Sequence, residues 1–346
     1  MRTKTITITG ISGANTKEFC AKYAQERENV KVYSTSDLIY KLAQNIPPEP
    51  PFLNENLLNL NPKFLNSLRD LAFDNMIDDI RKEKENYKRI VIDTHAQFFW
   101  NDVFHNAYNW RYLNEIDSDL FITLIDKPSS IKQRQLETEK GRIQEYDFRD
   151  LLLWQNMEIN VTKGWAENLK KPMYILPNKQ NPQIIENLLD NHFLIYFQMP
   201  MTEASSEAND MISQFKEKVL QVGKDLNKLP TPLIDPRDID MEQGSGLSNK
   251  IERTIRRHTV HRDLNWYISE ATDLIAFYPP GTNISIGVSY ETKEGFETGK
   301  NAFVVFPKEN TSPFMDAATK VFRTEEEFFD FFPNYMKKRI ERFKRN

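Results

Sequence analysis

The chain has 346 residues, of which 39% are hydrophobic, and a formal net charge of −4. Its length suits two ordinary domains, and its hydrophobic content is typical of folded globular proteins rather than disordered chains. The negative charge does not indicate broad attraction to nucleic acid, although small anionic ligands need only local positive groups. Cys20 is the single cysteine, which excludes an internal disulfide and any multi-cysteine zinc site.

The first segment, MRTKTITITG, alternates Thr and Ile, a pattern that favours a β-strand and not a secretory signal. No stretch of about 18 apolar residues predicts a membrane span. We therefore expect a soluble, cytoplasmic protein without a membrane partner. The strand leads into the loop GISGANTK, residues 10–17, and then into a helix. A strand, a glycine loop and a helix form the setting in which backbone N–H groups bind phosphate oxygens.

This loop resembles the phosphate-binding loop of adenylate-kinase-like nucleoside monophosphate kinases, Gly-x-x-Gly-x-Gly-Lys-Thr. Gly10 and Gly13 match, whereas Asn15 stands at the third glycine, Thr16 at the lysine and Lys17 at the Ser/Thr position. In that family the lysine reaches the β- and γ-phosphates and the hydroxyl holds magnesium. The resemblance implies a nucleotide-binding loop with ATP and Mg²⁺ as its ligands, and the exchanged residues predict impaired phosphoryl transfer.

The same resemblance continues to about residue 190. Residues 32–38 resemble the turn where such kinases hold the acceptor nucleotide, and a strand over 89–93 ends in Asp93-Thr94-His95. Asp93 is either a helix-capping carboxylate or a residue beside magnesium. Arg134 and Arg142 lie where the family has lid arginines, although we favour a solvated helix face for both. Further buried strands are expected over residues 120–126 and 173–176. These features predict a first domain, 1–190, with a doubly wound parallel sheet.

A new buried strand, HFLIYFQ, begins at residue 192, and we place the domain boundary between residues 190 and 191. The second domain, 191–346, is also expected to be a doubly wound parallel α/β domain. Its last helix, predicted over residues 325–345, should be broken or kinked near Pro333. The other elements expected in it are helices over 204–228, 250–260 and 285–300, and strands over 229–236, 273–278 and 302–307.

Three short patterns follow one another in this domain: RDLNW at 262–266, ATD at 271–273 and SIGVSYE at 285–291. Their order resembles the nucleoside 2-deoxyribosyltransferase family, and more closely its branch of 2-deoxynucleoside 5-monophosphate N-glycosidases, over residues 192–310. The resemblance implies that Glu291 is the nucleophile and that Asp263 protonates or orients the leaving base or the sugar. It also implies that Ser285 and Gly287 bind the 5-phosphate, and that Tyr196 contacts the sugar.

The chemistry agrees with this assignment. Cleavage of an N-glycosidic bond develops positive charge on C1 of the sugar, and a carboxylate beside that carbon stabilises the charge or traps it covalently. A nucleotide is then the small-molecule substrate, and no metal or cofactor is required for this cleavage. Because the family commonly assembles from several subunits, we expect a homo-oligomer.

The family's first strand ends in a glycine-rich turn, whereas residues 198–201 here read QMPM, which predicts an altered pocket.

Several interpretations remain open at this point. The second domain could hydrolyse or transfer the glycosidic bond of a nucleotide, a deoxynucleotide or NAD. Alternatively, both domains could bind nucleotides without turnover, as a sensor, or the first domain could be a working nucleoside monophosphate kinase.

Overall fold

The computed structural model describes residues 2–44, 57–137, 145–201, 205–239, 249–307, 315 and 318–344. By its internal contacts the chain divides into two compact units. Unit 1 comprises Met1–Pro182 and Met241–Thr254, and unit 2 comprises Gln183–Asp240 and Ile255–Asn346. Each contains a five-stranded parallel sheet with helices packed on it, so the predicted α/β class with two parallel sheets is confirmed.

The sheet of unit 1 is formed by β1 (Lys4–Thr9), β2 (Val30–Ser34), β3 (Arg89–Thr94), β6 (Leu120–Ile125) and β7 (Met173–Pro177). Its strand order is β2-β3-β1-β6-β7, and every neighbouring pair is parallel. An antiparallel hairpin that the sequence did not reveal, β4 (Gln97–Trp100) and β5 (Val103–Asn106), follows β3. The carboxyl ends of the parallel strands therefore share one edge, where α/β proteins bind ligands.

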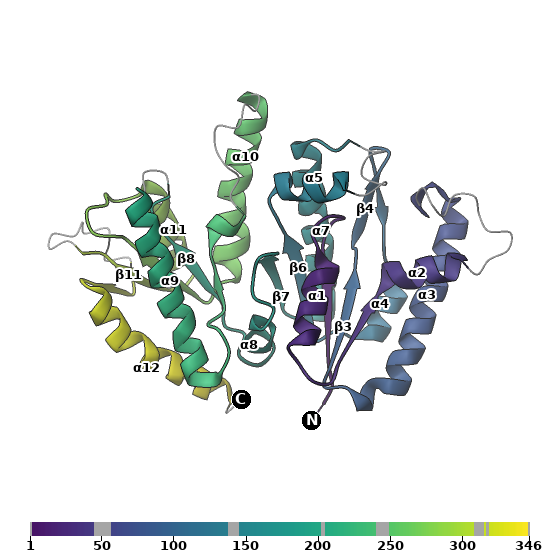
Figure 1. Ribbon diagram of the computed structural model, residues 1–346, viewed down its shortest axis with the longest axis horizontal. Helices are drawn as coiled ribbons and strands as arrows, with labels where there is room; N and C mark the ends of the chain where they lie inside the picture. Colours follow the sequence, from purple (N-terminus) through teal and green to yellow (C-terminus); the bar gives the residue numbers. More distant parts are fainter. Residues whose placement is uncertain are drawn as a thin grey trace. The chain divides into compact units, whose positions relative to one another are not determined.

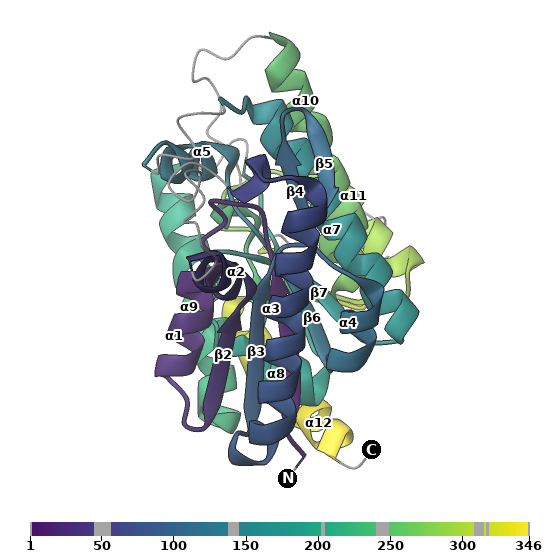
Figure 2. The ribbon, with the colours of Figure 1, turned by 90° about the vertical axis from the view of Figure 1, so that its right-hand side faces the viewer.

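Helices cover both faces of this sheet (Figure 1). They are α1 (Thr16–Gln25), α2 (Thr35–Gln44), α3 (Pro62–Glu83), α4 (Trp110–Ile116), α5 (Pro128–Leu136) and α7 (Phe148–Leu169), with short turns η1 (Leu57–Asn59) and η2 (Lys84–Asn86). Helices α3 and α4 pack on Ile90 and Ile92 of β3, and α3 runs along the strands (Figure 2). Helix α1 packs on the opposite face. Successive side chains of a strand point to opposite faces, so Asp93 faces away from Ile90 and Ile92, and Thr16 of α1 contacts Asp93.

The sheet of unit 2 is formed by β8 (Ile195–Gln198), β9 (Leu233–Ile234), β10 (Asp273–Phe277), β11 (Asn301–Val305) and β12 (Lys320–Phe322). Its order is β12-β11-β10-β8-β9, again with parallel neighbours. Taken in chain order this is the 2-1-3-4-5 arrangement of flavodoxin-like sheets, whose ligands bind where the winding reverses, between the first and third strands. In unit 2 that position lies at the carboxyl ends of β8 and β10.

The helices of unit 2 are α8 (Ile184–Asn191), α9 (Ser206–Asn227), η3 (Pro236–Asp238), the π-helix η4 (Arg262–Ile268), α11 (Ile286–Glu297) and α12 (Glu325–Lys344); α10 (Asn249–His261) has residues in both units. Helices α9 and α12 bury apolar side chains on one face of the sheet, including Phe215 and Phe332. Helix α11 packs on the other face through Val288, beside the side chains of Tyr278 and Ala276. The expected domain boundary, between residues 190 and 191, falls at the end of α8, which belongs to unit 2.

One element differs from expectation in its continuity. Helix α12 continues through Pro333, so of the two predicted alternatives, a break or a kink, the break is wrong. A proline inside a helix removes one hydrogen bond and costs roughly 3 kcal/mol. Phe328 and Phe332 before Pro333 and Met336 after it are all buried against the sheet. This packing offsets the cost.

Candidate functional sites

The site in unit 2 begins with a contact between β8 and α11. Tyr196 is fully buried in the middle of the sheet, and its hydroxyl donates a hydrogen bond to Glu291 Oε1 at 3.2 Å. Glu291 lies in the second turn of α11 and is half-buried. The Tyr196 ring also stacks on Tyr267, with ring centroids 5.8 Å apart. The structure thus brings together the residue expected at the sugar and the expected nucleophile, between β8 and α11.

Asp263 lies in the π-helix η4, which packs against α11. It forms a buried ion pair with its neighbour: Arg262 Nε and Nη2 are each 2.8 Å from Asp263 Oδ1. The guanidinium of Arg262 also lies 6.0 Å from the centroid of the Tyr267 ring. A chain of contacts therefore links Asp263, through Arg262 and the two stacked tyrosines, to Glu291. Single stretches of π-helix occur frequently at functional sites, because they displace side chains from regular helical positions.

The start of α11 is the expected phosphate position. Ser285 is the N-cap residue, and its hydroxyl accepts a hydrogen bond from Val288 N at 3.5 Å. Gly287 is exposed, and a Cβ at this position would meet only Ser285 Oγ, 3.7 Å away. The backbone around Gly287 is therefore open to a ligand. Glu291 lies six residues past Ser285, which corresponds to about 9 Å at ~1.5 Å per residue, the length of a sugar phosphate.

Gln198 is a residue of this site that the sequence interpretation did not select. It lies two positions after Tyr196, and its side chain therefore faces α11 as well. Thr292 Oγ1 contacts Gln198 Oε1 at 3.2 Å, while Gln198 Nε2 is buried and has no hydrogen-bond partner in the described part of the chain. A glutamine that ends an otherwise apolar strand was the available signal. No glycine follows, and Met199 and Pro200 are both buried.

The loop of residues 10–17 in unit 1 keeps the backbone of a phosphate-binding loop but directs its side chains elsewhere. Gly13 and Asn15 have positive φ angles of 89° and 64°. A Cβ at Gly10 would lie 2.6 Å from Thr16 Cγ2, so this position requires glycine. Thr16 is buried and hydrogen-bonded to Asp93, whereas Lys17 forms an exposed ion pair with Asp37 at 2.7 Å. Neither side chain is directed as the family's lysine is, toward the β- and γ-phosphates.

A buried carboxylate supports this loop from below. Glu158 of α7 accepts hydrogen bonds from the backbone N–H groups of Gly10 (3.1 Å), Ala96 (2.7 Å) and Gln97 (2.8 Å). Burial raises the pKa of Glu158 to about 8, although the three N–H donors act in the opposite direction. Glu158 therefore fixes the start of the loop relative to the segment that follows β3.

Asp93 and His95 lie beside the loop at the end of β3. Burial raises the pKa of Asp93, while hydrogen bonds from Thr16 and Ser34 lower it. His95 Nδ1 contacts Gly10 O, and because a carbonyl oxygen can only accept, Nδ1 carries the proton. In the neutral ring His95 Nε2 is then a hydrogen-bond acceptor. Burial lowers the pKa of the ring, while Asp93 and the contact with Gly10 O act in the opposite direction.

Of the two arginines expected in the lid, the structure describes only Arg134. Arg134 Nε donates to Gly13 O at 2.6 Å, and its guanidinium also pairs with Asp126. It is therefore not a solvated arginine, because it binds the loop. Arg142 lies outside the described residues. Among the described residues, no cluster of three His, Cys, Asp or Glu side chains could hold a metal ion.

A cavity of about 310 Å³ adjoins the loop in unit 1. Ser12 and Gly13 contribute to one wall, and His95 to another. The remaining walls mix aliphatic, aromatic and polar side chains, which come from α2, η1, α3, β4, α5, α7 and the segment before α7. A cavity of this size is at the lower end of the range for small-molecule sites.

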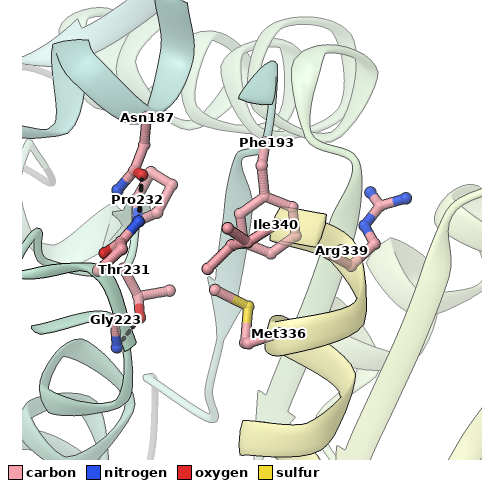
Figure 3. Close-up of a pocket in the computed structure, with 9 residues that line it drawn as sticks. Asn187, Phe193, Gly223, Thr231, Pro232, Met336, Arg339 and Ile340 are labelled. Carbon is pink, nitrogen blue, oxygen red and sulfur yellow. Dashed lines mark hydrogen bonds between the residues drawn. The ribbon is translucent and has the colours of Figure 1, made fainter. Parts of the chain in front are cut away.

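A second, much smaller cavity lies in unit 2, between Asn187, Phe193, Pro232, Met336 and their neighbours (Figure 3). Phe193 and Pro232 precede β8 and β9, so this cavity is at the amino ends of the strands. It lies at the edge opposite the Tyr196–Glu291 contact. We do not assign it to the candidate site.

Comparisons with known proteins bear mainly on unit 1. A family model described as "AAA domain" matches residues 9–149. This match supports the P-loop kinase-like character predicted for the N-terminal half. The resemblance of unit 2 to nucleoside deoxyribosyltransferases has no such match and stays a prediction.

No curated protein matches the chain. Among solved structures, it is similar to the tunicamycin resistance protein of Deinococcus radiodurans, with 11% identity and a TM-score of 0.30. That similarity covers 49% of this chain and 97% of the other. None of the helices in the described residues combines the length and apolarity that a membrane span needs.

Proposed function

We propose that unit 2 cleaves the N-glycosidic bond of a nucleotide or deoxynucleotide through Glu291. The hydrogen bond between Tyr196 and Glu291 carries this proposal, because it orients a carboxylate of α11 against β8, one of the two strands between which the winding of the sheet reverses. The open start of α11, about 9 Å away along the helix, supports a phosphate on the same ligand.

In this mechanism a Glu291 oxygen attacks C1 of the sugar while the C1–N bond breaks, and the electron pair leaves with the base. Tyr196 orients the carboxylate of Glu291 through its hydrogen bond to Oε1. Because Asp263 is ion-paired with Arg262, the proton that neutralises the departing base comes from water, and Asp263 orients the base or the sugar. Water then hydrolyses the glycosyl ester, or a second base accepts the sugar. The N–H groups near Gly287 hold the 5-phosphate throughout.

The test is to incubate the protein with ribonucleoside and deoxyribonucleoside monophosphates and with NAD, and to measure free base by chromatography. At least one substrate should release base, and Glu291→Gln should lower the rate by about 10³-fold or more. Glu297→Gln is a matched control, because Glu297 is exposed on the same helix and pairs only with Lys293 in the described contacts. Equal release by wild type and Glu291→Gln would reject the proposal.

For unit 1 we propose nucleotide binding with little phosphoryl transfer, with ATP and Mg²⁺ as the ligands to test. The exposed Lys17–Asp37 pair and the burial of Thr16 on Asp93 favour this over a working kinase. Calorimetry should detect ATP binding, and an ATP-consumption assay with monophosphate acceptors should show no product. Efficient product formation would instead select the kinase. Binding at both units without base release would select the sensor.

We also propose that the protein acts as a homo-oligomer. The support is the resemblance of unit 2 to a family that assembles. Light scattering on the purified chain tests this, and a monomeric mass at assay concentration would contradict it.

A further inference from the structure

Glu158 is a buried carboxylate directly behind the loop of unit 1. Its exposed fraction is 0%, and within the described residues it forms no ion pair with an arginine, lysine or histidine. Its carboxylate is held instead by three hydrogen bonds from backbone N–H groups. Because buried charges are normally paired with opposite ones, a charged Glu158 depends on these backbone groups alone.

The three hydrogen bonds are shared unequally by the two carboxylate oxygens. Oε1 accepts from Gly10 N at 3.1 Å and from Ala96 N at 2.7 Å, whereas Oε2 accepts only from Gln97 N at 2.8 Å. Each carboxylate oxygen has about two lone-pair sites. Oε2 therefore has a site left for a proton, and the charged and the neutral form of Glu158 both fit the same backbone.

Two opposing influences set the protonation of Glu158. Burial favours the neutral form and the three N–H donors favour the charged form, and together they bring its pKa to about 8. The two forms are thus close in free energy near neutral pH. A further charge placed nearby is enough to change which form prevails.

The loop offers a position for such a charge. Gly10, whose N–H group Glu158 binds, is the first residue of the loop, and Gly13 follows three residues later. Three residues span at most about 11 Å. Two like charges roughly 10 Å apart change a binding constant about 10- to 20-fold at an effective dielectric constant of ~20. A phosphate held by the loop would therefore destabilise a charged Glu158.

The elements that pack against α7 bring few charged groups close to Glu158. Strands β4 and β6 contain none. The charged and titratable side chains of the other neighbouring segments are Tyr174 on β7, Lys132 and Arg134 on α5, Asp126 after β6, and Asp93 and His95 at the end of β3. In the described part of the chain, none of these side chains forms a hydrogen bond or an ion pair with the Glu158 carboxylate.

We propose that unit 1 takes up a proton at Glu158 when a nucleoside di- or triphosphate binds its loop, so that binding weakens as the solution becomes more alkaline. The proton comes from solvent and binds Oε2. The inference rests on the nucleotide binding proposed for unit 1 and does not involve Glu291 of unit 2. The neutral form of Glu158 is the form that admits the anion.

The direction of the effect follows from the pKa of Glu158. In the free protein the carboxyl is neutral below about pH 8 and charged above it. A bound anion raises this pKa further, because it disfavours a second negative charge. Affinity is therefore constant below about pH 8 and falls above it. Between the pKa of the free protein and that of the complex, each bound ligand brings up to about one proton with it.

The experiment is a calorimetric titration of the full chain with ATP, ADP and neutral adenosine between pH 7 and 9.5. Buffers with different heats of ionisation give the number of protons taken up for each ligand bound. Glu158→Gln serves as the reference, because the titration of the ligand itself then cancels. Relative to it, the wild type should lose about 5- to 10-fold in affinity for ATP over this range and take up a proton near about pH 8.5. Adenosine should show neither effect.

Two features of the variants keep the test specific. Glu158→Gln retains a carbonyl oxygen for the N–H groups of Gly10 and Ala96, so it removes the charge while keeping the size of the side chain. Glu167→Gln is the matched control, because Glu167 is an exposed glutamate on the same helix, and it should keep the wild-type dependence on pH. If Glu158→Gln fails to fold by circular dichroism, the proton count of the wild type and its comparison of ATP with adenosine still decide.

Three results would overturn the inference. The first is an equal pH dependence in wild type and Glu158→Gln, which would assign the proton to Asp93 or His95. The second is ATP binding without proton uptake at any pH, and the third is the same pH dependence for adenosine as for ATP. Each of these leaves the nucleotide binding proposed for unit 1 intact, whereas a lack of ATP binding throughout the pH range would reject both.

Discussion

Units 1 and 2 each place a loop and a helix start after a buried parallel strand, yet their side chains behave differently. In unit 1, Lys17 turns outward to Asp37 and Thr16 is buried on Asp93. In unit 2, Tyr196 and Glu291 come from separate elements and meet. The comparison shows that the backbone of a phosphate-binding loop can persist while its side chains point elsewhere, and that convergent side chains are the better guide to a candidate site.

The largest expected effect is on the ion pair beside the unit 2 site. Arg262→Met removes the ion-pair partner of the buried Asp263 and should lower the free energy of unfolding by about 3–5 kcal/mol. Urea denaturation measures it. The double variant Arg262→Met/Asp263→Leu should recover part of this loss, because both charges are then removed. A double variant less stable than the single one would show that the loss of charge pairing is not what destabilises Arg262→Met.

A smaller effect is expected when the contact that orients the proposed nucleophile is lost. Tyr196→Phe removes the hydroxyl from Glu291 Oε1 while the ring keeps its stacking on Tyr267. We expect kcat for base release to fall by about 10- to 100-fold with a small change in KM, because a charge-assisted hydrogen bond is worth roughly 1.5–3 kcal/mol. Tyr290→Phe, an exposed tyrosine on α11, is the control. An unchanged kcat would mean that the contact is not used in the reaction.

The buried carboxylate under the unit 1 loop predicts a pH dependence. Burial raises the pKa of Glu158 from 4.5 to about 8, so the folded state binds its proton more tightly than the unfolded state does. The stabilisation is full below pH 4.5 and is lost as the pH rises through about 8. Urea titrations from pH 5 to 9 should show wild type losing stability relative to Glu158→Gln, which has no titrating carboxyl. A constant difference would show that the three N–H donors keep Glu158 ionised.

The smallest effect is expected at Lys17. Its ion pair with Asp37 is exposed, and such pairs contribute about 0–1 kcal/mol. Lys17→Ala should therefore change ATP affinity less than about twofold, as should the control Lys22→Ala on the same helix. In a working phosphate-binding loop the lysine contacts the phosphates, so a loss of ATP binding in Lys17→Ala alone would break the contrast between the units.

Much of the fold follows from local patterns. Runs such as HFLIYFQ indicate strands buried on both faces, and strands separated by helices predict parallel sheets. The hairpin β4–β5 and the edge strand β12 were missed, because both are short and lack a clear alternating pattern. Pro333 suggested a break in α12, but the packing of the neighbouring phenylalanines outweighs the local effect of the proline.

The candidate sites were predictable where a motif carries them and not where distant segments meet. Glu158 gives no local signal, because its three partners lie 61 to 148 residues away in the chain. Arg69, which lines the cavity beside the unit 1 loop, did offer one: it occupies the apolar stripe of α3, between Leu65 and Phe73, where a charge is unexpected. Gln198 likewise ends an apolar strand. A polar residue at a position that the pattern assigns to the core is thus a usable signal of function.

The most direct test of the central claim is to identify the residue that becomes attached to the sugar. A substrate that releases base is quenched in acid after a brief incubation, and the digested protein is mapped by mass spectrometry, with a 2-fluoro analogue to slow hydrolysis of the ester. The account predicts one sugar phosphate ester on Glu291, absent from Glu291→Gln. An ester on any other residue, or base release without an ester on Glu291, would contradict it.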